Sequence, residues 1–139
     1  MLLSQVKSIV TNKITVTGGL RMPEDDVLAD LAHEALRFVA SRCVPSELLR
    51  DSEADVGESV FRFIEGGKYI LMPDFPDFSN TVKHLMIDEE LSFAVINKMV
   101  ALMSRDALEI SRYESEATKT INRYKANAIR IGYGATITE

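Results

Sequence analysis

The stretch from Leu91 to Met103 constrains the fold most, because only three of its residues are polar. A helix that is apolar nearly all round is usually the buried centre of its domain. Asp88 is a good N-cap for this helix, and Glu89 and Glu90 stand in its first turn, where acidic residues complement the helix dipole. The sequence therefore predicts a central helix that other helices must surround.

The apolar positions continue beyond this stretch, at steps of three and four residues, as far as Ala128. Ser-Arg-Asp at 104–106 interrupts the apolar run. Either one long helix covers 89–130, or two helices meet near 104–106. The second part, 106–130, is charged on one side, and we expect that side to face solvent.

Two more helices are expected in the first third of the chain. Residues 2–14 have apolar residues at helical spacing, and the glycine pair at 18–19 makes 15–22 a turn or connector. Pro23 and the acidic residues after it favour a helix over 23–43, which carries a wide apolar stripe. We predict that this helix and the helix over 89–103 pack together to build the core.

The helical spacing of apolar residues ends before residue 59. Residues 46–57 read as a short helical turn plus loop. Two runs of aromatic and branched residues then flank Gly66 and Gly67, which predicts a β-hairpin over 59–72. The two prolines of 73–78 prevent regular structure there. Phe75 and Phe78 in this loop either anchor it in the core or offer an exposed contact, and we count both among the candidate partner-binding residues.

Residues 131–139 do not continue the helix, because Gly132 and Gly134 break it and the other residues are β-prone. The expected fold is thus mainly α: a small helical bundle over 1–130 with an inserted β-hairpin, followed by an extended arm over 131–139. Ile131, Tyr133 and Ile137 are the apolar residues that we expect the arm to offer to a partner.

Composition limits the possible functions. The 139 residues carry a formal net charge of −5, which argues against a dedicated DNA-phosphate binder but not against a protein that lines a passage for DNA. Cys43 is the single cysteine, so an internal disulfide or a cysteine-based zinc site is excluded. We expect no signal peptide, no membrane span and a location inside the producing cell.

The sequence offers no catalytic, cofactor-binding or metal-binding constellation. His33 beside Glu34 is open to two interpretations, a base oriented by a carboxylate or a partly buried structural histidine, and we favour the second. His84 and Asp88 share a helical spacing, but two ligands are too few for a metal site. We expect a protein that is not an enzyme.

The order of the predicted elements resembles the head–tail connector (adaptor) family of tailed bacteriophages. The residues that carry the resemblance are the opening of the apolar helix at 87–96 and the charged, tyrosine-bearing segments at 112–117 and 121–125. The resemblance implies a structural virion protein at the head–tail junction, present in the host cytoplasm during assembly. It also implies a ring of about twelve copies beneath the portal protein, above a tail or tail-completion protein, through which DNA passes without specific binding.

The charge distribution agrees with such a ring. Residues 21–60 carry ten acidic and four basic side chains, whereas 105–130 carry four acidic and six basic ones. This asymmetry suits a contact between unlike surfaces of neighbouring subunits, and Arg112 and Arg123 are the basic residues expected in partner contacts. The alternatives are solvated helix faces with no partner, and a small helical binding or regulatory module, such as a chaperone or inhibitor of a host or phage protein.

Overall fold

The computed structural model describes residues 1–16, 21–51 and 59–130. Within them it contains the helices α1 (Leu3–Val16), α2 (Asp25–Arg42), α3 (Ser92–Met103) and α4 (Ala107–Arg130), and the strands β1 (Leu49–Asp51), β2 (Val60–Ile64) and β3 (Lys68–Leu71). Two short 3-10 helices, η1 (Ser46–Leu48) and η2 (Glu89–Leu91), precede β1 and α3. The predicted fold class, mainly α with a β-hairpin, is confirmed.

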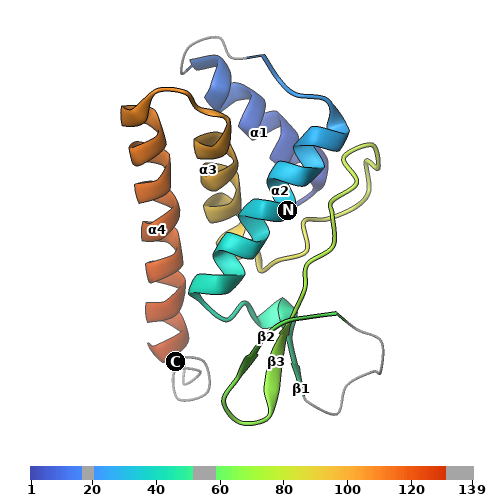
Figure 1. Ribbon diagram of the computed structural model, residues 1–139, viewed down its shortest axis with the longest axis vertical. Coiled ribbons are helices and arrows are strands. Elements are labelled where there is room, and N and C mark those ends of the chain that lie inside the picture. The colour runs from blue at the N-terminus through green and yellow to red at the C-terminus, as the bar shows by residue number, and fades with distance from the viewer. Residues whose placement is uncertain (17–20, 52–58, 131–139) are drawn as a thin grey trace.

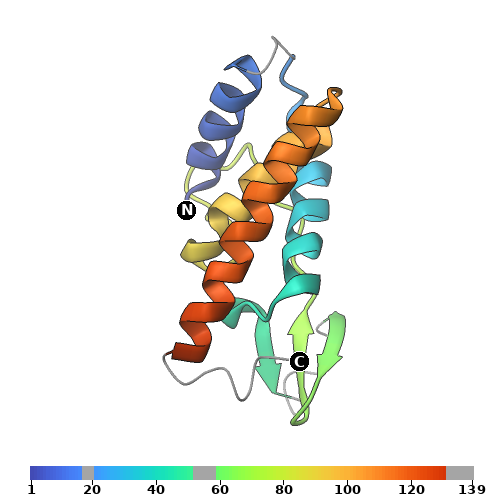
Figure 2. The ribbon, with the colours of Figure 1, turned by 90° about the vertical axis from the view of Figure 1, so that its left-hand side faces the viewer.

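Helix α3 is the centre of the helical body, as its composition predicts. It packs against α1, α2 and α4. Figures 1 and 2 show α4 along one side of α3, with α1 and α2 on the other sides. Five of its apolar side chains have no exposed surface: Ala94, Val95, Ile96, Met99 and Val100. Burial of these side chains is the main contribution that α3 makes to stability.

Two helices cover the last third of the described chain rather than one. Helix α3 ends at Met103, and Ser104 adopts an extended conformation while its hydroxyl donates to the carbonyl of Val100 at 2.8 Å. Helix α4 starts at Ala107, and the Asp106 carboxylate accepts a hydrogen bond from the Leu108 amide at 3.1 Å. The Asp106 carboxylate thus satisfies an amide that the start of a helix leaves free.

The predicted hairpin is present and belongs to a three-stranded antiparallel sheet with the order β1-β3-β2. Its turn contains Gly66 and Gly67, which have φ angles of 84° and 72°, a region that favours glycine. The sheet lies at one end of the molecule (Figure 1). A second cluster of buried residues joins it to the ends of α2 and α4: Ala40, Val44, Leu48, Ile64, Ile70, Leu71 and Ala128.

Strand β1 corrects the sequence prediction, which gives a short helical turn plus loop over 46–57 and no strand there. The turn exists as η1, but the next three residues pair with β3, with Arg50 opposite Tyr69. Residues 52–58 lie outside the described residues. A strand of three residues that includes arginine and aspartate has no alternating pattern, so only its pairing with β3 reveals it.

The helix bounds also differ from the predicted ones. Helix α1 continues two residues beyond 14. Helix α2 begins at Asp25 rather than Pro23, because Glu24 has an extended backbone while its carbonyl accepts from the Leu28 amide at 2.9 Å. The predicted stripe of α2 is too wide as well, since Val27 is 46% exposed and Leu31 is only half-buried. Helices α2 and α3 do pack together, as predicted.

Candidate interaction surfaces

Residues 73–78, which we call the strap, run along α2 and are held there by His33. The His33 side chain is buried, and its Nε2 lies 3.0 Å from the carbonyl oxygen of Pro73. Its ring stacks on Phe75, with centroids 3.8 Å apart and planes 13° apart. A carbonyl oxygen only accepts, so Nε2 must carry the proton and donate it.

His33 is therefore a structural residue, as the second interpretation of the sequence proposed. Burial lowers its pKa from the ordinary value, and Arg37 adds to that effect, while the Pro73 hydrogen bond, Asp30 and Asp74 oppose it. The ring is neutral at neutral pH. Because the ring is buried and stacked on Phe75, little of it is accessible to a substrate.

The two phenylalanines of the strap have different roles. Phe78 is 7% exposed and belongs to the main core, so it anchors the strap. Phe75 is 59% exposed, although one face of its ring is covered by His33. Of the two predicted partner residues, only Phe75 offers its ring at the surface.

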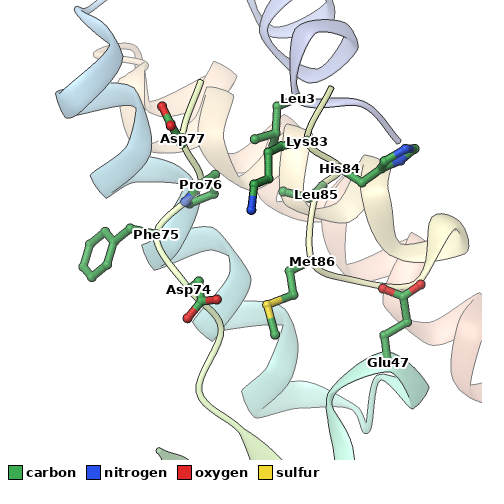
Figure 3. A pocket seen from close by; sticks show the side chains of 10 residues that line it. All are labelled: Leu3, Glu47, Asp74, Phe75, Pro76, Asp77, Lys83, His84, Leu85 and Met86. Carbon is green, nitrogen blue, oxygen red and sulfur yellow. The ribbon is translucent and has the colours of Figure 1, made fainter. Parts of the chain in front are cut away.

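A groove of about 390 Å³ lies between the strap and residues 83–86 (Figure 3). The Lys83 side chain extends into it, whereas the Phe75 ring points away from it. Asp77 already accepts hydrogen bonds from the amide and hydroxyl of Ser79, which lower its pKa. The groove is lined by Leu3, Glu47, Asp74, Phe75, Pro76, Asp77, Lys83, His84, Leu85 and Met86.

This lining brings three carboxylate side chains and Lys83 together without a nucleophile beside a base. The groove can hold a polar or charged group, but the residues around it form no catalytic arrangement. His84 is exposed there, and its backbone pairs with Leu2. Across the described ranges, no three histidine, cysteine or carboxylate side chains gather as a metal site would require.

Cys43 is buried, and its thiol donates to the carbonyl of Val39 at 3.4 Å. Burial is the largest cause that raises the pKa of this thiol, to about 12, and Asp88 adds to it. The thiol therefore stays protonated and unreactive, as a core cysteine does. None of the helices in the described part of the chain is both long and apolar enough to cross a bilayer.

Comparisons of the chain with protein-family models, with curated proteins and with solved structures find no match.

Asp88 forms a latch between distant segments, a role that the sequence does not reveal. Its carboxylate accepts from the Ser46 amide at 3.1 Å, the Ser46 hydroxyl at 2.5 Å and the Glu47 amide at 2.9 Å. It also accepts from the Tyr124 hydroxyl of α4 at 2.8 Å. Asp88 makes no side-chain hydrogen bond to the helix that follows it. The predicted N-cap thus acts on η1, 42 residues away, and not on its own helix.

The outer side of α4 carries a row of charged residues that faces away from α3. Arg112, Glu116, Lys119 and Arg123 are all exposed and recur at helical spacing. Within the helix, Arg112 lies 3.6 Å from Glu109, and Lys119 lies 3.5 Å from Glu116. Such exposed pairs contribute at most about 1 kcal/mol, so these side chains remain available to a partner.

Helix α2 has a corresponding outer row of opposite charge. Asp26, Asp30 and Glu34 are exposed at steps of four residues, and exposed Arg37 follows. The residues that α2 buries against the core are on its other side, including Leu28, Ala32 and Leu36. The outer rows of α2 and α4 thus both face away from α3.

The structure does not bring all the predicted partner residues together. Arg112 and Arg123 share one row of α4, but the strap with Phe75 lies on the other side of the molecule (Figure 1). Ile131, Tyr133 and Ile137 lie outside the described residues. The Asp88 latch and the groove were not predicted, because each depends on residues far apart in the chain.

Proposed function

We propose that the protein is a head–tail connector subunit of a tailed bacteriophage, which forms a ring of about a dozen copies beneath the portal and part of the DNA exit channel. One observation supports this most: large exposed apolar side chains occur at both ends of the long axis. Phe63 in the sheet is 75% exposed, and Leu108 in the first turn of α4 is 79% exposed. The sheet and the start of α4 lie at opposite ends of the molecule (Figure 1).

A subunit placed between two other components needs contacts at both of its ends. A ring subunit also needs contacts on two flanks, and the rows of α2 and α4 supply charged residues there. The residues around the groove offer no chemistry that would favour an enzyme. Under this proposal the protein acts by contact alone, in the virion and, before assembly, in the host cytoplasm.

We further propose that residues 131–139 bind the portal as an added strand. Tyr133 and Ile137 alternate with polar residues in this segment, as in a strand that joins the edge of another sheet. Removal of 132–139 should leave the helical fold intact and weaken binding to the portal.

The direct test mixes the purified protein with the portal protein encoded in the same genome and examines the complexes by negative-stain electron microscopy and native mass spectrometry. The proposal expects a ring of many copies on the portal. Leu108→Ser and Phe63→Ser should each remove contacts at one end only, without loss of fold, because both side chains are exposed. Val82→Ser, which also changes a 75% exposed side chain, is the matched control. A protein that never binds portals or forms rings would contradict the proposal.

One observation favours a second candidate, a small binding or regulatory module: the groove of about 390 Å³ is large enough to hold part of a partner. Such a module would form a complex of few subunits with one partner. Mass measurements of the same mixtures separate the two candidates.

A further inference from the structure

The charged rows of α2 and α4 match each other in spacing and sign when one is read in reverse. Along α2 the charges are negative at Asp30, negative at Glu34 and positive at Arg37, at steps of four and three residues. Along α4, read backwards, they are positive at Arg123, positive at Lys119 and negative at Glu116, also at steps of four and three. We infer that α2 of one subunit docks antiparallel on α4 of a second copy in this register.

The register brings three pairs of opposite charges together. Asp30 faces Arg123, Glu34 faces Lys119, and Arg37 faces Glu116. Four residues of a helix rise about 6 Å, so the distance along α2 from one carboxylate to the next equals that between their partners on α4. In the same register Val27, which is 46% exposed, faces exposed Ala126. An apolar contact thus continues the row of charge pairs.

A parallel arrangement matches less of the pattern. It can place Asp30 against Lys119 and Glu34 against Arg123, but Arg37 then faces Ala126 and loses its acidic partner. The antiparallel register therefore satisfies one charge pair more. Like charges opposed across an interface are costly, and shifted registers lose charge pairs or oppose like charges, so matched signs favour this register over shifted ones.

The two rows cannot meet within one molecule, because each lies on the side of its helix that faces away from α3. Two copies can bring them together. The contact joins two different surfaces, so the subunit that docks its α2 row keeps a free α4 row, and its neighbour keeps a free α2 row. Repetition of such a contact gives a closed ring when the rotation per subunit closes, and a filament otherwise. The inference rests on the proposed function in that it names the lateral contact of the ring.

Cysteine pairs test the register directly. In Glu34→Cys/Lys119→Cys, the two new thiols face each other across the interface, and mild oxidation should give a ladder of disulfide-linked oligomers. Glu34→Cys/Arg112→Cys is the matched control, since Arg112 lies on the same row but about 10 Å further along the helix. Cys43 does not interfere because it is buried. Equal ladders from the two variants, or no ladder from the first, would overturn the register.

Charge reversal tests the energetics. Asp30→Lys/Glu34→Lys and Lys119→Glu/Arg123→Glu should each weaken self-association by about tenfold or more in low salt. An equimolar mixture of the two variants should associate again, because each then offers the row that the other lacks. A chain with all four changes should also associate. Failure of both rescues would contradict the inference.

The portal assay distinguishes the failure of this inference from the failure of the proposed function. Rings on the portal together with equal cysteine ladders would refute the docking mode and leave the connector function standing. A specific ladder and charge rescue without any binding to the portal would support the docking mode and refute the connector function.

Discussion

Loss of the Asp88 carboxylate should weaken the joint between the helical body and the sheet. In Asp88→Ala, the amides of Ser46 and Glu47 lose an acceptor that acts as the cap of η1, which costs about 1 kcal/mol. The Tyr124 hydroxyl, on a side chain only 7% exposed, loses its 2.8 Å bond and keeps the carbonyl of Val44 at 3.3 Å. Loss of a hydrogen bond to a charged group adds about 1–2 kcal/mol. We expect the free energy of unfolding to fall by about 2–3 kcal/mol in total.

Urea unfolding followed by circular dichroism measures this loss, provided that the m-value is unchanged. Tyr124→Phe alone should cost about 1 kcal/mol, because Asp88 keeps its other donors. In Asp88→Ala/Tyr124→Phe the total loss should be about 1 kcal/mol smaller than the sum of the two single losses, because the two groups share a hydrogen bond. Tyr113→Phe is the control on the same helix, since the Tyr113 hydroxyl makes no hydrogen bond within the described residues. A loss below about 0.5 kcal/mol in Asp88→Ala, or strict additivity, would refute the latch.

The stability that the latch contributes should also depend on pH in the alkaline range. Burial and the hydrogen bond to Asp88 raise the pKa of the Tyr124 phenol. The folded state therefore holds this proton more tightly than the unfolded state, in which tyrosine ionises near pH 10. The resulting stability is fully present below about pH 10 and is lost as the pH rises towards the folded pKa. The stability advantage of the natural chain over Tyr124→Phe should shrink above that pH.

Two further outcomes are expected. Val95→Ala, at a site in α3 with no exposed surface, should lower the free energy of unfolding by about 2–3 kcal/mol. Leu31→Ala, at a half-buried site in α2, should lower it by about 1 kcal/mol. Equal losses in urea unfolding would contradict the packing of α2. His33 has a lowered pKa, so its stabilising effect is present above about pH 6.5 and is lost as the pH falls through the folded value. Stability between pH 4 and 7 should depend less on pH in His33→Phe than in the natural chain.

The sequence predicts the centre of this fold well because α3 has almost no polar positions. A helix of that kind has few alternatives to complete burial. The turn at Gly66 and Gly67 was equally predictable, since positive φ angles favour glycine and the flanking runs are β-prone. Both signals are local, and each follows from the chemistry of adjacent residues.

Other features depend on partners far along the chain. Asp88 is a plausible N-cap by position, but the donors of η1 and Tyr124 engage its carboxylate instead. The stacking of His33 on Phe75 likewise joins two segments that sequence periodicity cannot relate. Arg112 and Arg123 could be placed on one exposed row in advance, because helical spacing alone puts them there.

The fold does not require the charges of the two outer rows. Exposed ion pairs within α4, such as Lys119 with Glu116, contribute at most about 1 kcal/mol, whereas the packing of α3 dominates stability. Reversal of charge on Asp30 or Arg123 should therefore change unfolding very little. If the same reversals abolish self-association, stability and assembly are encoded on opposite sides of α2 and α4. The inner sides then specify the subunit, and the outer sides specify its neighbour.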